Sequence, residues 1–181
     1  RRAVERRAGG REKKGAFLSG GLDSSSIVSL LSSHEGSGIS TFSFRCRGES
    51  FDESHYARIV ADEYNTDHVL VEYTPEDTAL AEEMVSLMEE PFCDVGINIG
   101  TYLLAREASG RVHDLFTGDG GDELFAGHPV YMADKATRYI DWIPRFLIYP
   151  LLYAGRQLGD SVKKKDLKVK IKRYSENFLY P

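Results

Sequence analysis

The sequence predicts an open parallel α/β sheet with helices on both faces. Short apolar or alternating runs are separated by longer stretches in which apolar residues recur with helical spacing. Strands and helices that alternate through short loops are typical of a parallel sheet covered on both faces. Two glycine-rich loops directly follow two of the expected strands. With 181 residues, 41% of them hydrophobic and 28% charged, the chain can build one globular core.

Local patterns place each element along the chain. Alternation of apolar and polar residues indicates the strands, and apolar residues at helical spacing indicate most of the helices between them. Ser50 or Asp52 can cap the second helix, and Pro75 can start the third. The expected strands are 15–18, 39–45, 67–73 and 112–116. The expected helices end near 33 and 64, begin at Pro75, and span about 97–109.

Two of these helices are expected to bury an apolar face. The second helix would bury Tyr56, Ile59, Val60 and Tyr64, and the third would bury Leu80, Met84, Val85, Leu87 and Met88. His68 has no second His or Cys beside it, so we expect a solvent-exposed residue at the edge of the sheet. Cys46 and Cys93 lack flanking motifs and are expected to be structural, reduced thiols.

The first loop, Ser19 to Ser25, reads Ser-Gly-Gly-Leu-Asp-Ser-Ser between an apolar run and a helix. A strand, a glycine turn and a helix start present several backbone N–H groups to one anion. Asp23 stands where a common phosphate loop would supply positive charge, so a divalent cation has to separate it from phosphate. The loop therefore predicts a phosphate site with Mg²⁺. An ordinary turn with a helix cap is the alternative.

The second loop, Thr117 to Gly127, follows the last expected strand. Its carboxylates Asp119, Asp122 and Glu123 offer the oxygen ligands that Mg²⁺ prefers. The spacing does not fit a calcium-binding EF-hand loop, and three carboxylates exceed what a helix cap needs. In an open sheet of order 3-2-1-4-5 both loops leave neighbouring strands, so Asp23 and Asp122 can meet around one ion.

Composition and charge argue against several classes of protein. The chain has a net charge of −5 and only two cysteines, which argues against a disulfide scaffold. No apolar region follows the Arg-rich start, and no apolar stretch has the roughly 20 residues of a membrane span. Seven Arg or Lys residues fall within 1–14 and eight within 156–173. We expect a helix end or frayed tail at 1–14, and the alternative is a basic arm for nucleic acid.

Both loops resemble one known family. Ser19 to Ser24 resembles the SGGxDS loop of the N-type ATP pyrophosphatases, the PP-loop superfamily. The second loop resembles the S-G-[ED]-G-x-D-E-x-F-[GA]-G segment of the synthetase domain of glutamine-dependent asparagine synthetases. Segments 51–54, 90–92 and 102–104 are also similar. The likeness covers about 15–131 and implies an adenine nucleotide alpha hydrolase-like fold.

The resemblance implies an ATP-dependent, amide-forming ligase. The side-chain carboxylate of aspartate would attack ATP, giving an acyl-adenylate and pyrophosphate, and ammonia would then displace AMP. Asp119 matches the family's acidic position near the acyl-adenylate and is the implied catalytic residue. The implied metal ligands for Mg²⁺ are Asp23, Asp122 and Glu123. The implied ATP-binding residues are Leu18, Ser19, Gly20, Gly21, Asp23, Ser24, Ser25, Phe44, Thr117 and Gly118.

The resemblance also implies domains and partners. We expect a charged tail at 1–14, the ATP pyrophosphatase core at 15–131, and an incomplete helical extension at 132–181. The substrates would be ATP, aspartate and ammonia, in a cytoplasmic enzyme without membrane or nucleic-acid partners. A glutaminase domain would come from elsewhere in the full-length protein. We therefore expect a fragment that does not itself release ammonia from glutamine.

The sequence differs from the family's pattern in four features. Gly96, Gly100 and His128 stand where the family tends to carry other residues, and no segment matches the family's later E-V-R-x-P context and Lys. Another acyl-adenylating synthetase, forming a β-lactam or another amide, is one alternative. A tRNA-modifying protein that uses the basic stretch 163–173 is another. The apolar stretch 143–153 is expected to pack against further protein or to form a homodimer contact.

Overall fold

The structure is a computed structural model that describes residues 1–10, 12–35, 38–46, 52–89 and 97–127. Seven single positions are also described: Tyr131, Lys135, Pro144, Leu147, Pro150, Tyr153 and Ala154. The chain forms two compact units, Arg1–Asp119 and Gly120–Pro181. The expected helical extension falls almost entirely outside the described residues, as do Cys93, Gly96, His128 and segment 163–173.

Four parallel strands form the sheet of the first unit, as the sequence predicts. They are β1 (Lys14–Phe17), β2 (Ser40–Arg45), β3 (Asp67–Glu72) and β4 (Asp114–Phe116), in the order β3-β2-β1-β4. In the register, Ala16 of β1 pairs with Thr41 on one side and Phe116 on the other. The predicted neighbourhood of the first and fourth strands is confirmed, so the two loops leave the same end of adjacent strands.

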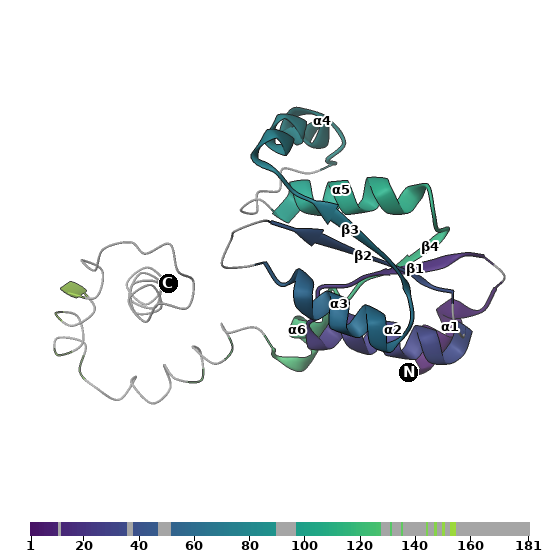
Figure 1. Cartoon of the computed structure of the whole chain (residues 1–181). Coiled ribbons are helices and arrows are strands. Elements are labelled where there is room, and N and C mark those ends of the chain that lie inside the picture. Colours follow the sequence, from purple (N-terminus) through teal and green to yellow (C-terminus); the bar gives the residue numbers. More distant parts are fainter. Residues whose placement is uncertain are drawn as a thin grey trace. The chain divides into compact units, whose positions relative to one another are not determined.

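Helices cover both faces of this sheet (Figure 1). One face carries α1 (Arg2–Ala8), α2 (Leu22–Glu35) and α3 (Ser54–Glu63), and the other carries α5 (Ile97–Ser109). A 3-10 turn, η1 (Pro75–Leu80), and α4 (Ala81–Ser86) lie between β3 and α5 in the chain. The second unit contains α6 (Gly121–Phe125). Among the described residues, no helix combines the length and apolar character needed to cross a membrane.

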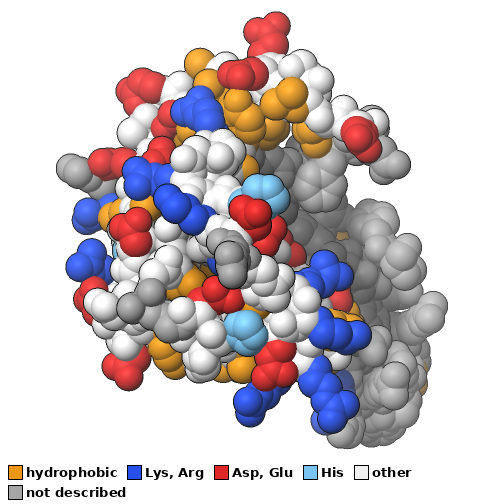
Figure 2. Space-filling view, turned by 90° about the vertical axis from the view of Figure 1, so that its right-hand side faces the viewer, with side chains coloured by type: hydrophobic (Ala, Val, Ile, Leu, Met, Phe, Trp, Pro, Cys, Tyr) orange, Lys and Arg blue, Asp and Glu red, His pale blue; other side chains and the backbone are white. Residues whose placement is uncertain are grey.

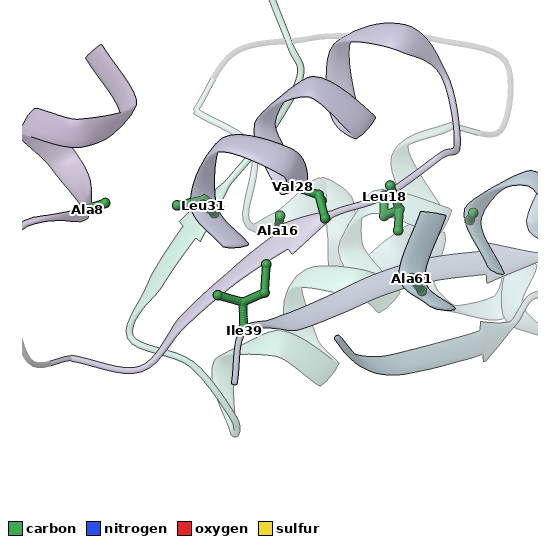
Figure 3. Close-up of a cluster of buried hydrophobic side chains, with 8 residues drawn as sticks. Ala8, Ala16, Leu18, Val28, Leu31, Ile39 and Ala61 are labelled. Carbon is green, nitrogen blue, oxygen red and sulfur yellow. The ribbon is translucent and has the colours of Figure 1, made fainter. Parts of the chain in front are cut away.

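Two apolar clusters hold the layers together. The first lies between the sheet and α1–α3, and Figure 3 shows how its side chains point toward one another. Its members are Ala8, Ala16, Leu18, Val28, Leu31, Ile39, Ala57 and Ala61. On the other face, Phe42 packs with Leu104 and Ala108 of α5. Leu18 belongs to the first cluster and also precedes the first loop, so packing fixes where that loop begins.

The prediction that four large apolar residues of α3 are buried is only half right. Val60 and Tyr64 pack against the first cluster, but Tyr56 and Ile59 are 52% and 62% exposed. Ala57 and Ala61, four residues apart, form the buried centre instead. Small side chains let the helix approach the sheet closely, which turns its larger neighbours outward.

The expected burial of Val85 and Leu87 is wrong as well. Both are exposed, at 61% and 65%. The segment after Pro75 begins as a 3-10 turn, and α4 ends at Ser86, so one continuous helical face never forms. Hydrophobic side chains are visible at the top of Figure 2, the level at which α4 lies in Figure 1.

His68 lies on the edge strand β3, as expected, but it is not a solvent-exposed residue. Its Nδ1 lies 2.9 Å from Oγ1 of Thr41, which lies 2.7 Å from Oγ1 of Thr66. Its Nε2 is buried and has no hydrogen-bond partner among the described residues. The surroundings therefore suit a neutral imidazole, because a proton on Nε2 would be buried without an acceptor.

We expect the free energy of unfolding to fall as the pH drops below about 6.5, the usual pKa of histidine. Burial lowers the pKa of His68 and nearby Arg58 lowers it further, against opposing effects of Asp62 and Asp67. Because the folded pKa lies below the unfolded value, the unfolded chain binds more protons between the two. Stability is thus full above the unfolded pKa and is lost as the pH falls through the folded one.

Urea unfolding at about pH 7.5 and about pH 5.5 measures this dependence. His68→Gln keeps a hydrogen-bonding group beside Thr41 but cannot gain the proton, so it should flatten the pH dependence. The same loss of stability in both proteins would show that His68 is not the responsible group.

Candidate functional site

The first loop is organised by its own hydroxyl groups. The N–H of Ser19 donates to Oγ of Ser24 at 3.2 Å, and the two serine Oγ atoms lie 3.0 Å apart. The N–H of Gly21 donates to Oγ of Ser19 at 3.2 Å, and Oγ of Ser24 donates to the Gly21 carbonyl at 3.3 Å. These four bonds close the loop into a compact turn at the end of β1.

The start of α2 enables this turn to bind an anion. The first backbone bond of the helix runs from the N–H of Ser25 to the Gly21 carbonyl, at 3.0 Å. The N–H groups of Leu22, Asp23 and Ser24 precede that bond, in the turn whose amides lack intrahelical acceptors. The helix dipole adds partial positive charge there. Oγ of Ser25 is buried without a hydrogen-bond partner in the described part of the chain, which leaves a donor for a bound group.

Gly20 sets the loop against the beginning of α3. It has a φ of +81°, in the left-handed region that favours glycine. A Cβ placed on Gly20 would lie 2.5 Å from Cβ of Tyr56 and 2.6 Å from the backbone N of Ala57. Glycine is therefore required here both by conformation and by close packing, and α3 forms one wall of the loop.

Asp52, just before α3, ties the start of this helix to its surroundings. The N-cap of α3 is Glu53 rather than the expected Ser50 or Asp52, and the Glu53 side chain makes no capping hydrogen bond. Asp52 lies one residue earlier, and its Oδ1 accepts a hydrogen bond from the N–H of Ser54 at 3.0 Å. The hydrogen bond from the Ser54 side chain is the main cause that holds the pKa of Asp52 below its usual range, and Arg45 contributes in the same direction. Arg45 Nε lies 3.6 Å from Oδ2 of Asp52 and thereby links the end of β2 to the start of α3.

Gly118 brings the two loops together. A Cβ placed on Gly118 would lie 3.0 Å from the backbone N of Ser24 and 3.3 Å from Cβ of Asp23. The backbone after β4 therefore touches the first turn of α2, at the carboxyl ends of two adjacent parallel strands. Thr117 and Gly118 thus lie beside the first loop, and Asp119 follows them as an exposed residue at the end of the first unit.

Phe44 occupies the carboxyl end of β2. Its ring is partly exposed and lies 3.7 Å from the position that a Cβ of Gly100 would take at the start of α5. An aromatic ring that is open on one side and supported on the other can stack against a planar base. The placement of Phe44 at the same sheet edge as Leu18 and Thr117 is compatible with the predicted adenosine contact.

Asp122 and Glu123, the other predicted metal ligands, are exposed on α6 of the second unit. The backbone N–H of Gly127 donates to the Asp122 carbonyl at 3.0 Å and closes this short helix. In the described part of the chain, no three His, Cys, Asp or Glu side chains are grouped closely enough to hold a metal ion. One or two carboxylates together with ATP phosphates suffice for Mg²⁺, so Asp23 beside an anion site fits that ion.

The sequence matches the family model described as asparagine synthase over residues 1–179. The chain belongs to the asparagine synthase family. It is 32% identical over 154 residues to an inferred glutamine-hydrolysing asparagine synthetase of Mycobacterium tuberculosis, covering 84% of this chain and 23% of that protein. It is 30% identical to glutamine-hydrolysing asparagine synthetase 1 of Bacillus subtilis, with coverage of 84% and 24%. The chain thus spans about a quarter of the length of these relatives.

Among solved structures, an NH3-dependent NAD synthetase from Campylobacter jejuni has a TM-score of 0.47 and 12% identity. The match covers 70% of this chain and 56% of that one.

Two contacts of the first loop were not predicted from the sequence. The wall that Tyr56 and Ala57 form against Gly20 was missed because Tyr56 was assigned to a buried helix face. The hydroxyl of Ser43 in β2 donates to the Leu18 carbonyl, immediately before the first loop. A polar residue in a buried strand was the available signal, but its partner depends on the strand register.

Proposed function

We propose that this chain holds the ATP-dependent, amide-forming part of an asparagine synthase. The observation that carries the proposal is the contact between Gly118 and the turn at Asp23 and Ser24, since it unites the two family motifs at one sheet edge. Family membership supplies the reaction class. In open α/β sheets, ligands bind at the carboxyl ends of the strands where neighbouring connections diverge, which agrees with this location.

In this proposal the ATP phosphates bind the first loop. The first-turn amides of α2 and the hydroxyl of Ser25 provide the donors, and the hydroxyls of Ser19 and Ser24 hold the turn that presents those amides to ATP. The adenosine lies beside Phe44 and the backbone of Leu18, Thr117 and Gly118. Asp23, Asp122 and Glu123 are the residues that would hold Mg²⁺, and the ion would neutralise phosphate charge.

The proposed reaction has two displacements at the bound nucleotide. The β-carboxylate of aspartate attacks the α-phosphorus, the bond to the bridging oxygen breaks, and pyrophosphate leaves. Ammonia then attacks the activated carbonyl carbon, AMP leaves, and a proton is lost from nitrogen. Positioning and charge stabilisation dominate such chemistry, and Asp119 is proposed to orient ammonia or accept its proton. In the longer protein a glutaminase domain would supply the ammonia.

Pyrophosphate release tests the proposal. The chain is mixed with ATP, Mg²⁺, ammonia and aspartate, and with the same mixture lacking aspartate. Pyrophosphate that forms only with aspartate, together with asparagine, is the expected result. No MgATP binding by calorimetry, or release that is indifferent to the amino acid, would contradict the proposed function.

Asp23→Asn is expected to weaken ATP binding about tenfold or more when Mg²⁺ is present, and to have little effect without it. The substitution keeps the side-chain size but removes the negative charge that attracts the cation. Calorimetric titration with ATP, with and without Mg²⁺, measures both affinities. Equal affinity of the two proteins for MgATP would rule out a metal-bridging role for Asp23.

A further inference from the structure

The peptide group that joins Leu18 to Ser19 is held by side chains at both of its polar atoms. Its carbonyl oxygen accepts a hydrogen bond from the hydroxyl of Ser43, and its N–H donates to Oγ of Ser24 at 3.2 Å. Both hydroxyl-bearing residues are buried, with 4% exposure for Ser43 and 7% for Ser24. This peptide group is the point at which the chain leaves β1 and enters the first loop.

The side-chain bonds begin where the sheet ladder ends. The N–H of Leu18 still donates to the Phe42 carbonyl at 2.9 Å, one residue beyond the last strand residue, Phe17. The next polar atom along the chain, the Leu18 carbonyl, is satisfied by the Ser43 side chain. A side-chain donor lets the backbone turn away from β2 without leaving a buried carbonyl unpaired.

We infer that Ser43 is a positioning residue for the nucleotide-binding loop. Its hydroxyl fixes the plane of the Leu18–Ser19 peptide group, and Ser24 fixes the same plane from the other side. The orientation of that plane sets the direction in which Ser19, Gly20 and Gly21 leave the strand. Ser43 would thus act on phosphate binding through the loop, without touching the nucleotide. The inference rests on the proposed function, because it concerns the loop proposed to bind ATP.

A substitution of Thr41 is the control that distinguishes a positioning role of Ser43 from a general contribution to stability. It lies two residues before Ser43 on β2, so both side chains are on the same face of the strand. Its side chain is also fully buried, and its hydroxyl lies within hydrogen-bond distance of Thr66 and His68, toward β3 and away from the loop. Ser43→Ala and Thr41→Val each remove one buried hydroxyl with little change in volume. Only the first removes a bond to the loop.

Calorimetric titration with MgATP is the first measurement, on the unsubstituted chain and on Ser43→Ala, Ser43→Thr and Thr41→Val. We expect Ser43→Ala to bind about tenfold more weakly, which corresponds to about 1.4 kcal/mol. Ser43→Thr keeps the hydroxyl and should recover most of the affinity. Thr41→Val should bind like the unsubstituted chain even if its thermal midpoint drops. If Ser43→Ala does not fold, Ser43→Cys replaces it, because a thiol is a weak donor of similar size.

Amide hydrogen exchange without nucleotide is the second measurement. We expect faster exchange at Ser19 and Gly21 in Ser43→Ala and unchanged exchange there in Thr41→Val. Equal MgATP affinity for Ser43→Ala and the unsubstituted chain, or equal losses in Ser43→Ala and Thr41→Val, would overturn the positioning role. If the unsubstituted chain binds no MgATP, the proposed function fails, and unchanged loop exchange in Ser43→Ala would separately overturn the peptide-plane contact.

Discussion

Replacing Gly20 with alanine is expected to lower the free energy of unfolding by about 3 kcal/mol and to abolish detectable MgATP binding. The new methyl group would lie 2.5 Å from Cβ of Tyr56 and 2.6 Å from the backbone N of Ala57. Neither neighbour is the flexible end of a side chain, so the loop or α3 has to move. The φ of +81° adds conformational strain. Urea unfolding and calorimetric titration with MgATP measure the two effects.

Gly38→Ala is the matched control for this substitution. Gly38 also has a positive φ, +134°, but a Cβ there would meet no atom of the described residues within 4 Å. It should lose only about 1 kcal/mol, from backbone strain alone, and keep the affinity for MgATP. If Gly20→Ala and Gly38→Ala behave alike, the close packing of the first loop against α3 is not what makes Gly20 necessary.

Sheet topology was predictable because it follows from local patterns and general rules. Apolar alternation located the strands to within about two residues, and short connections required them to run parallel. The order β3-β2-β1-β4 agrees with the order expected for an open sheet with two diverging connections. The same rule predicted that the first loop and residues 117–119 share one sheet edge, and the contact of Gly118 with Asp23 confirms that they meet. Their catalytic and binding roles stay predictions.

Helix faces were less predictable than strands. In α3 the large apolar residues Tyr56 and Ile59 suggested a buried face, but Ala57 and Ala61 occupy its centre. Hydrophobic periodicity gives the width of an apolar stripe, whereas the helix-to-sheet distance decides which part of the stripe is covered. That distance depends on Leu18 and Ile39, which come from other segments of the chain.

Side-chain hydrogen bonds between strands were beyond sequence reasoning. Thr41 is near His68, and Ser43 donates to the Leu18 carbonyl, across 27 and 25 residues of sequence. A shift of one residue in the register would turn these hydroxyls to the opposite face of the sheet. The two polar contacts therefore depend on a register that no local pattern specifies. The contact between Thr41 and His68 is the reason why the expectation of a solvent-exposed His68 was wrong.

Replacing the buried Lys14 with alanine is the second large effect, a loss of about 3 kcal/mol in the free energy of unfolding. The Lys14 side chain is 1% exposed, and its Nζ lies 3.3 Å from Oε2 of Glu35 at the end of α2. Nζ also donates to the carbonyls of Gly10 and Glu12 at 3.0 and 3.2 Å. Alanine would remove all three interactions and leave a cavity where the aliphatic stem packs.

Two further substitutions separate the contributions of the Lys14 charge, its aliphatic stem and its buried position. Lys13→Ala, at an exposed position one residue earlier, should change the stability by no more than about 0.5 kcal/mol. Lys14→Met keeps most of the stem and should lose less than Lys14→Ala. Because Lys14 begins β1 and the first loop follows its other end, MgATP affinity of the folded protein should not change in any of these variants. A Lys14→Ala protein as stable as Lys13→Ala would mean that the buried ammonium contributes nothing to holding α2 against the sheet.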